Sequence, residues 1–419
     1  MQAKVKTGKV WDVVVIGGGP AGMMAAGRAT ERGRSVLLLE KNPTLGKKLL
    51  ITGGGRCNVT NNKTNIHIML SKYKDSDKFL FSAFSQFGVQ GTLDFFQRRG
   101  MATKEEAEGR VFPASNTAQS VWDVLVRYLK DGGVKVQTNA AVAGLTLDTV
   151  TKQIVIQLKD KTEIRAVSCI VATGGSSRPE TGSTGEGFHW LKKLGHTIIE
   201  NNFALVPIAL HDAWAKKLGG LTLNDIKLTV FQDGVKHGVQ KGKLLFTHFG
   251  ISGPTVLNMS RAIGELLQYG EVQIRLDLFP GLSHETLKQQ LQALLLAESN
   301  KKLKNALRKL IPAALVSALL ELARVDGETT NHSVRHEERK KLVALMKAIP
   351  LNVKGLLGAN KAVVSSGGVA IKEVHFKTMR SRLIPQLYLI GDVLNIDRPS
   401  GGYSLQLCWT TGFVAGSNS

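Results

Sequence analysis

The chain of 419 residues is long enough for two or three domains, and its 43% of hydrophobic residues can form a packed core, which excludes a disordered protein. Its three cysteines, Cys57, Cys169 and Cys408, lie far apart, which excludes a disulfide framework and a cysteine-based zinc site and is typical of a cytoplasmic protein. Lysine and arginine outnumber aspartate and glutamate by 22 without forming a basic tail, so the charge favours anionic ligands but names none.

The hydrophobic stretches of the chain are all short. The most apolar helical stretch, residues 313–323, contains Glu321 and is well below the ~20 residues that a membrane-spanning helix needs. The apolar residues 13–16 near the start are too few for the core of a signal peptide. We therefore expect a cytoplasmic protein that does not enter a membrane, and we expect no metal site.

A nucleotide-binding motif opens the chain. Residues 11–16 predict a buried parallel strand because they are rich in β-branched residues. The glycine-rich turn 17–22 follows, then a predicted helix over residues 23–30, and a second apolar strand over residues 35–39 that ends in Glu40. This order and size match the βαβ unit that binds dinucleotides.

Each part of this motif has a physical task. Gly17 allows the tight turn, Gly19 lets the backbone approach a pyrophosphate, and Gly22 lets the helix pack closely against the strand. The start of the helix offers free N–H groups and a partial positive charge to the phosphates. Glu40 is placed to accept hydrogen bonds from a ribose hydroxyl.

A second glycine-rich block covers residues 47–58. Three successive glycines cannot form a stable helix or strand, so they predict a loop that a ligand approaches closely. Arg56 has two interpretations, a partner for a phosphate or a solvated surface charge. Asn58 is suited to hydrogen-bond a heteroaromatic edge. For Cys57 we favour a small buried side chain over a redox role, because no second cysteine lies near it.

The middle of the chain changes its pattern twice. Up to residue 187 the predicted elements belong to the nucleotide domain: a helix over residues 115–130 capped by Ser115 or Asn116, strands over residues 134–137 and 154–158, and an apolar strand from residue 169 that ends in Gly174-Gly175. The run of residues 181–187 lacks a preceding strand, so we reject it as a second dinucleotide site.

From about residue 207, short alternating stretches predict an antiparallel or barrel-like module. They cover residues 226–231, 243–247 and 272–276. Residues 284–348 then have a helical pattern, in which Pro312 starts or kinks one helix. We expect this part to be an insertion into the nucleotide domain.

The chain ends with a strand, a loop and a helix. The strand over residues 386–390 runs into Gly391 and Asp392, and Asp392 could bind a chain of sugar-like hydroxyls. Gly402 opens the final helix, whose positive end would favour the negative charge that a reduced flavin carries.

Over nearly its whole length, the chain resembles the HI0933-like group of FAD-dependent oxidoreductases. The resemblance rests on residues 17–22, 47–61, 109–113, 172–175, 181–187, 246–254, 366–369 and 391–406. The blocks Gly-Gly-Gly-Arg-Cys-Asn and Thr-His-Phe-Gly are much more specific than the first glycine motif. The chain departs from the family pattern in having Asp392 for Glu, Asn395 for Asp and Ser404 for Asn.

The resemblance implies an α/β fold, with FAD held by a Rossmann-like domain of the glutathione-reductase type. Residues 1–205 and 351–419 would form this domain, residues 206–283 an inserted β-barrel-like substrate module, and residues 284–350 a helical module. The FAD contacts that it implies are Gly17, Gly19, Pro20, Ala21 and Gly22 at the pyrophosphate; Glu40 and Lys41 at the adenosine ribose; Lys47, Gly54, Gly55, Arg56, Cys57 and Asn58 along the flavin and phosphates; Val142 at the adenine; and Ala172, Thr173, Gly174, Gly391, Asp392, Gly402, Tyr403, Ser404 and Leu405 around the rest of the cofactor.

We expect an FAD-dependent oxidoreductase that acts on a small organic substrate by hydride chemistry at flavin N5, with NAD(P)H as reductant or O2 as oxidant. The substrate would lie between the flavin and the inserted module, near His248 and the loop after Asp392. His248 is a candidate proton donor or acceptor, or else a structural histidine, and Asn58 is the second candidate catalytic residue.

Two other functions compete with this one. The charge of +22 suggests an RNA-associated or RNA-modifying flavoprotein, but the charge is dispersed and no RNA-binding module is visible. An NAD(P)-dependent dehydrogenase without flavin does not explain three separate nucleotide-facing blocks.

Overall fold

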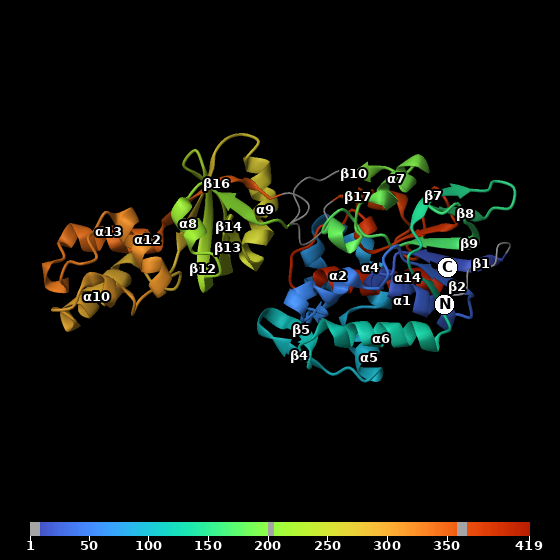
Figure 1. Cartoon of the computed structure of the whole chain (residues 1–419), viewed down its shortest axis with the longest axis horizontal. Coiled ribbons are helices and arrows are strands. Elements are labelled where there is room, and N and C mark those ends of the chain that lie inside the picture. Colours follow the sequence, from blue (N-terminus) through green and yellow to red (C-terminus); the bar gives the residue numbers. More distant parts are fainter. Residues whose placement is uncertain (1–8, 200–204, 358–366) are drawn as a thin grey trace. The chain divides into compact units, whose positions relative to one another are not determined.

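The computed structural model describes residues 9–199, 205–357 and 367–419, and the chain divides into two compact units (Figure 1). Unit 1 consists of residues 1–202 and 363–419, and unit 2 of residues 203–362. Each has its own hydrophobic core.

The centre of unit 1 is a seven-stranded sheet in the order β6-β2-β1-β9-β8-β7, with β18 also paired to β9. These strands are β1 (Val10–Ile16), β2 (Val36–Leu39), β6 (Lys135–Gln137), β7 (Val142–Leu147), β8 (Ile154–Leu158), β9 (Glu163–Val171) and β18 (Leu387–Leu389). The strands β6, β2, β1, β9 and β18 are parallel, whereas β7 and β8 add an antiparallel hairpin. The α/β class and the first βαβ unit are therefore confirmed.

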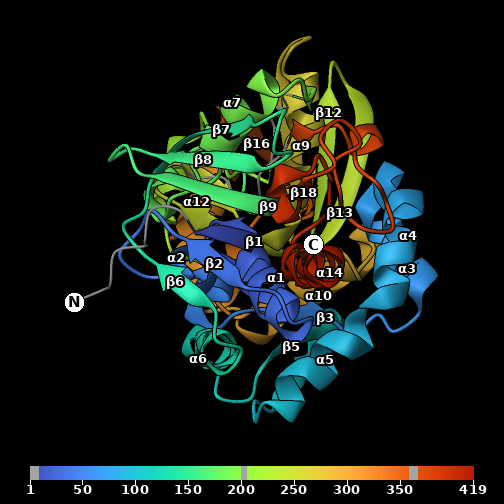
Figure 2. The same ribbon diagram turned by 90° about the vertical axis from the view of Figure 1, so that its right-hand side faces the viewer.

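Helices flank this sheet. The predicted helix after the glycine turn is α1 (Pro20–Glu31), and the final helix is α14 (Tyr403–Asn418), which lies beside α1 and is almost entirely buried (Figure 2). The helix α6 (Ala118–Asp131) is capped by Thr117, whose hydroxyl accepts a hydrogen bond from the Gln119 N–H at 3.2 Å. The cap expected at Ser115 or Asn116 was wrong, because Asn116 has a positive φ of 57° and belongs to the preceding turn.

Smaller elements complete unit 1. The helices are α2 (Lys47–Leu50), α3 (Ile66–Leu70), α4 (Asp77–Gln86), α5 (Val89–Arg98) and α7 (Glu186–Lys193). The strands β3 (Thr60–Asn61), β5 (Arg110–Pro113) and β4 (Thr103–Glu106) form a separate antiparallel sheet, and β10 (Ile198–Ile199) pairs with β17 (Gly368–Val369). Residue 366, the first of one segment behind the resemblance, lies outside the described residues.

Unit 2 contains a closed barrel in the order β11-β14-β13-β12-β15-β16. Its strands are β11 (Ile208–Leu210), β12 (Thr222–Gln232), β13 (Val235–Thr247), β14 (Gly250–Ser252), β15 (Val272–Asp277) and β16 (Ile349–Leu356). The helices of the unit are α8 (Ala213–Lys217), α9 (Pro254–Leu266), α10 (His284–Ala297), α11 (Leu303–Leu307), α12 (Ala313–Ala323) and α13 (His336–Lys347).

The domain boundary expected between residues 350 and 351 needs correction. The strand β16 pairs with β15 on one side and with β11 on the other, and so closes the barrel. Barrel residues such as Leu276 and helical residues such as Leu342 also belong to one continuous core. The barrel and the helices are therefore one compact unit.

A buried ion pair joins the two parts of unit 2. The Asp277 carboxylate, 2% exposed, lies 2.9 Å from Lys347 Nζ and 3.0 Å from Lys227 Nζ. Burial raises the pKa of Asp277, but the hydrogen bonds from the two lysines outweigh it, so the net shift is downward. Lys347 also donates to the carbonyls of Phe279 and Leu282, at 2.7 Å each.

We expect Lys347→Met to lower the free energy of unfolding by about 3 kcal/mol, because the substitution removes one of the two ammonium groups that pair with the buried Asp277 carboxylate. Urea titration of both proteins measures the loss. Because the folded pKa of Asp277 is depressed, its contribution is present above its unfolded pKa of ~4 and is lost as the pH falls through the folded pKa. The stability gap between wild type and variant should therefore narrow in acid; a gap that widens below pH ~4 would contradict this account.

Candidate cofactor site

A groove runs along the carboxyl ends of the parallel strands of unit 1. This is the edge at which open α/β sheets bind their ligands. The predicted residues that line it are Gly17, Gly19, Pro20, Ala21, Glu40, Lys41, Lys47, Val142, Ala172, Thr173, Gly174, Gly391 and Asp392. Segments from both ends of the chain thus meet in one site.

The glycine turn at the start of the groove has no room for side chains at two positions. A Cβ on Gly22 would lie 1.9 Å from the Gly17 carbonyl oxygen, and one on Gly17 would lie 2.5 Å from the Ala172 carbonyl oxygen. At Gly19, by contrast, an added Cβ would meet no atom within 4 Å, and no side chain caps α1 there. The open space and uncapped helix start are what a pyrophosphate requires.

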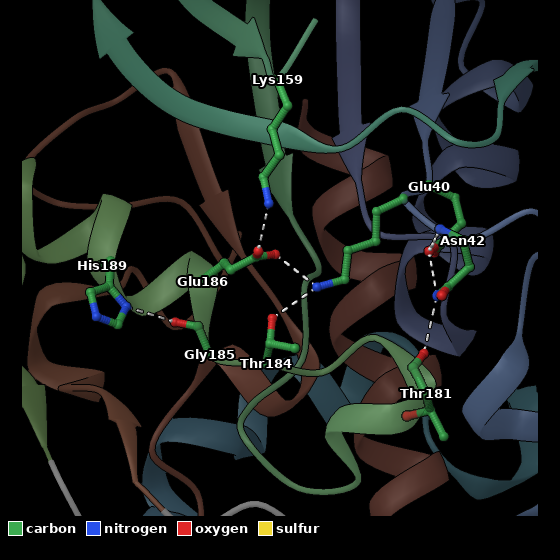
Figure 3. Close-up of polar contacts among 9 residues, drawn as sticks. Glu40, Asn42, Lys159, Thr181, Thr184, Gly185, Glu186 and His189 are labelled. Atoms are coloured by element: carbon green, nitrogen blue, oxygen red, sulfur yellow. Dashed lines mark hydrogen bonds and ion pairs between the residues drawn. The ribbon is translucent and has the colours of Figure 1, made fainter.

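The Glu40 carboxylate is hydrogen-bonded to the glycine turn. Glu40 is 8% exposed, and its Oε2 accepts a hydrogen bond from the Gly18 N–H at 2.8 Å. Its Oε1 accepts two hydrogen bonds from Asn42, from the backbone N–H and from Nδ2, at 2.8 Å each (Figure 3). Because Oε2 accepts only the one hydrogen bond from Gly18 among the described residues, it keeps a lone pair to which a ribose hydroxyl can still donate. The contacts fix the carboxylate in an orientation that suits this role.

The run of residues 181–187 forms one wall of the same groove, which the sequence did not reveal. Asn42 Nδ2 donates to the Thr181 carbonyl at 3.1 Å, and Lys41 Nζ donates to Thr184 Oγ1 at 2.8 Å and to Glu186 Oε2 at 2.7 Å (Figure 3). Burial raises the pKa of Glu186, but its hydrogen bond from Lys41 and the nearby Lys159 lower it by more, so the net shift is downward. This wall was missed because it has no strand before it.

Asp392, which also lines the groove, follows β18 and forms an ion pair with the buried Arg398. Arg398 also donates to the Ile396 carbonyl at 2.8 Å and to Ser404 Oγ at 3.0 Å, and so joins the groove to the first turn of α14. Lys48 lines the groove too, and burial lowers its pKa although Asp392 opposes the shift. Neither Arg398 nor Lys48 was predicted, because a single basic residue gives no signal in the sequence.

Other predicted residues are not among those that line the groove. They are Gly22, Gly54, Gly55, Arg56, Cys57, Asn58, Gly402, Tyr403, Ser404 and Leu405. Arg56 is bound by Glu106, donates to Asn116 Oδ1 at 2.7 Å and stacks over the Phe112 ring at 4.2 Å. Its guanidinium is therefore paired with protein groups in this structure, and its pairing with a phosphate stays a prediction.

Two further residues of the second glycine block have defined environments. Asn58 has a buried side-chain oxygen without a hydrogen-bond partner among the described residues. Cys57 is completely buried with a positive φ of 60°, as the interpretation of a small buried side chain requires.

Burial keeps the three thiols of the chain away from reagents in solution. All three cysteines are free and buried, and burial raises the pKa of Cys57 and of Cys408 to about 12. Since the thiolate is the reactive form, we expect the native protein to react with no equivalent of a thiol reagent at neutral pH and the urea-unfolded protein with three. A fast-reacting thiol in the native protein would overturn this expectation.

His248 belongs to unit 2, on the turn between β13 and β14. It is exposed, and its ring packs edge-on against Phe249 with 4.9 Å between the ring centroids. Within the described residues, its side chain forms no hydrogen bond that would fix the ring.

The groove fits an extended dinucleotide on its own geometry. It offers an uncapped helix start at Gly19, an oriented carboxylate at Glu40 and a second carboxylate at Asp392. Thr173 in its wall has a buried hydroxyl that finds no partner among the described residues. Such a group is suited to bind a ligand.

The sequence matches the family described as "HI0933-like protein Rossmann domain" over residues 11–418. The chain belongs to the HI0933-like family. It is accordingly an FAD-dependent oxidoreductase with a Rossmann-like FAD-binding domain, and the cofactor and enzyme class expected from the sequence are confirmed.

Two relatives are similar to this chain over almost its whole length. A "3-dehydro-bile acid delta(4,6)-reductase" of Clostridium scindens is 31% identical over 96% of this chain and 97% of its own. A "ribosomal RNA dihydrouridine synthase" of Escherichia coli is 30% identical over 96% of each chain. The 3-ketosteroid Δ1-dehydrogenase of Sterolibacterium denitrificans shares the fold, with a TM-score of 0.55 and 12% identity over 97% of this chain and 98% of its own.

Neither a metal centre nor a membrane-spanning helix is present in the described part of the chain. No group of three or more histidine, cysteine, aspartate or glutamate side chains there is arranged to hold a metal ion. None of the helices in the same residues combines the length and apolar character that a membrane crossing needs.

Proposed function

We propose that this protein is an FAD-dependent reductase that saturates a carbon–carbon double bond conjugated to a carbonyl group. The observation that carries the proposal is the shared chemistry in the names of two relatives, each similar over 96% of this chain. Reduction at the 4 and 6 positions of a 3-oxo bile acid saturates double bonds conjugated to a ketone. Formation of dihydrouridine saturates the double bond of uracil that is conjugated to its C4 carbonyl.

The reaction adds a hydride at the β-carbon and a proton at the α-carbon. The two electrons that the hydride carries come from an external donor, for which we propose NAD(P)H. When bound, FAD supplies the hydride from its reduced form. We propose that Gly19 and Glu40 hold the adenosine diphosphate part and Asp392 the ribityl hydroxyls. His248 and Asn58 are the residues that we propose for binding the carbonyl or delivering the proton, and Gln and Ala variants of each test these roles.

Two substrate classes fit this reaction. One is a small steroid-like enone, as in the name of the clostridial relative, and the other is a uracil base within RNA, as in the name of the E. coli relative. The net charge of +22 favours the second, since RNA is a polyanion. The three unpaired thiols support a cytoplasmic location, which we also propose.

Anaerobic stopped-flow spectroscopy tests the proposal. The enzyme is reduced with NADH or NADPH and then mixed with a 3-oxo-4-ene steroid, a uridine-containing RNA, or the saturated form of each as a control. We expect the flavin colour to return with at least one unsaturated compound and with neither saturated control. Reoxidation by O2 alone, with no response to either unsaturated compound, would rule the reductase out.

A further inference from the structure

The outer face of the barrel in unit 2 carries a row of basic side chains around one aromatic ring. Along β12 the residues that point outward are Lys227, Thr229 and Phe231, because the alternate residues Leu228 and Val230 are buried in the core. Paired residues on neighbouring strands point to the same face, so the pairing register identifies the rest of this surface.

On one side, β13 places Lys241 beside Lys227, Val239 beside Thr229 and Lys236 beside Phe231. On the other side, β15 places Arg275 beside Thr229. We call Phe231, Lys236, Lys241 and Arg275 the barrel basic face.

Within the described ranges, the cations of this face have no acidic partners. Lys227 is neutralised by the buried Asp277, but among the residues that the structure describes no carboxylate pairs with Lys236, Lys241 or Arg275. Lys236, Lys241 and Arg275 are all exposed. Three unpaired positive charges on one sheet face form a surface that attracts a polyanion.

The aromatic ring gives this surface a second property. The Arg275 guanidinium lies over the Phe231 ring, 4.2 Å from the ring centroid, and the ring is half-buried. Such an arginine–aromatic pair offers planar surfaces against which a nucleic-acid base can stack. Phosphates on either side of that base would find Lys236 and Lys241 on the neighbouring strand.

We propose that the barrel basic face binds a single-stranded segment of RNA. This inference rests on the proposed function, because a uracil base within RNA is one of the two substrate classes that we propose for the reductase. Charge complementarity favours a polyanion, and the stacking pair favours one with unpaired bases over an acidic peptide or a lipid surface, since single-stranded RNA carries a flat base beside every phosphate.

Fluorescence anisotropy of a labelled, unstructured, uridine-rich RNA with the full FAD-loaded chain tests the proposal. We expect the triple variant Lys236→Ala/Lys241→Ala/Arg275→Ala to bind at least about tenfold more weakly at ~100 mM salt and to show a salt dependence shallower by about two phosphate contacts. Phe231→Leu should weaken binding about fivefold without changing the salt dependence, because it removes a stacking surface and no charge.

A matched control removes the same charge elsewhere. Lys130, Lys192 and Lys193 are exposed in unit 1, and no carboxylate pairs with them in the described ranges, so their triple alanine variant should change RNA affinity less than about twofold. Equal losses in the two triple variants would overturn the proposal, as would absence of RNA binding by the wild type. The proposal would also be overturned if the wild type bound phosphatidylglycerol vesicles as tightly as RNA and the barrel triple variant lost this vesicle binding. That result would assign the face to lipid.

The two proposals fail separately. If the protein reduces a free steroid enone but its RNA binding is absent or insensitive to the barrel variants, the basic face is wrong and the reductase stands. If RNA binding depends on the barrel basic face but no unsaturated carbonyl compound reoxidises the flavin, the reductase is wrong and the RNA surface stands.

Discussion

Replacing Gly22 with alanine is expected to weaken FAD binding by at least about 100-fold, which corresponds to about 3 kcal/mol. The added Cβ would lie 1.9 Å from the Gly17 carbonyl oxygen, which is backbone and cannot rotate away. Either α1 or the Gly17 turn must move, and both form the pyrophosphate end of the groove. The measurement is the ratio of flavin to protein after purification, followed by FAD titration of the stripped protein.

A control for this variant is Gly144→Ala on β7, where no atom lies within 4 Å of the added Cβ. It should retain full FAD. Because Gly22→Ala could also prevent folding, Glu40→Gln provides a second test at the same end of the site. It keeps the shape of the side chain, and we expect FAD affinity to fall about tenfold while the circular dichroism spectrum remains that of the wild type. Unchanged flavin content in both Gly22→Ala and Glu40→Gln would mean that FAD does not lie along this turn.

The second large effect is expected at Arg398, whose side chain is only 1% exposed. Arg398→Met leaves the Asp392 carboxylate in a largely buried place without its cation, so we expect a loss of about 3 kcal/mol in the free energy of unfolding. FAD affinity should fall as well, since Asp392 loses its fixed orientation. Urea titration and FAD titration measure the two losses.

A double variant separates these two effects. In Arg398→Met/Asp392→Asn the carboxylate that lost its cation is removed as well, so stability should return to within about 1 kcal/mol of the wild type. FAD affinity should stay low, because the carboxylate that faces the groove is missing. If the double variant is less stable than Arg398→Met alone, the ion pair does not explain the instability.

The parts of the fold that could be predicted are those in which neighbouring residues carry the signal. The strand, glycine turn, helix, second strand and Glu40 follow one another in the sequence and lie together in the structure. The same holds for β18, Asp392 and the start of α14. Local patterns are sufficient there because the backbone itself forms the site.

The parts that could not be predicted depend on partners far apart in the chain. The role of β16 is decided by β11 and β15, which no local pattern in residues 349–356 reveals. Arg56 meets Glu106 only after folding, and Lys48 faces the groove only because α2 turns it inward. Segment 181–187 lines the groove of the first glycine turn, whereas its local pattern argues only against a second dinucleotide site.

The chain leaves unit 1 after β10 and returns to it before β17. In both units, the strands on either side of the insertion are paired with each other. In unit 1, β10 before the insertion is hydrogen-bonded to β17 after it, with Ile198 opposite Val369. In unit 2, the entering strand β11 is hydrogen-bonded to the leaving strand β16, with Ile208 opposite Leu356. In each unit, the two strands next to the crossings are therefore neighbours in one sheet. Recombination that replaced residues 203–362 with another domain whose ends are adjacent would leave the FAD-binding domain intact.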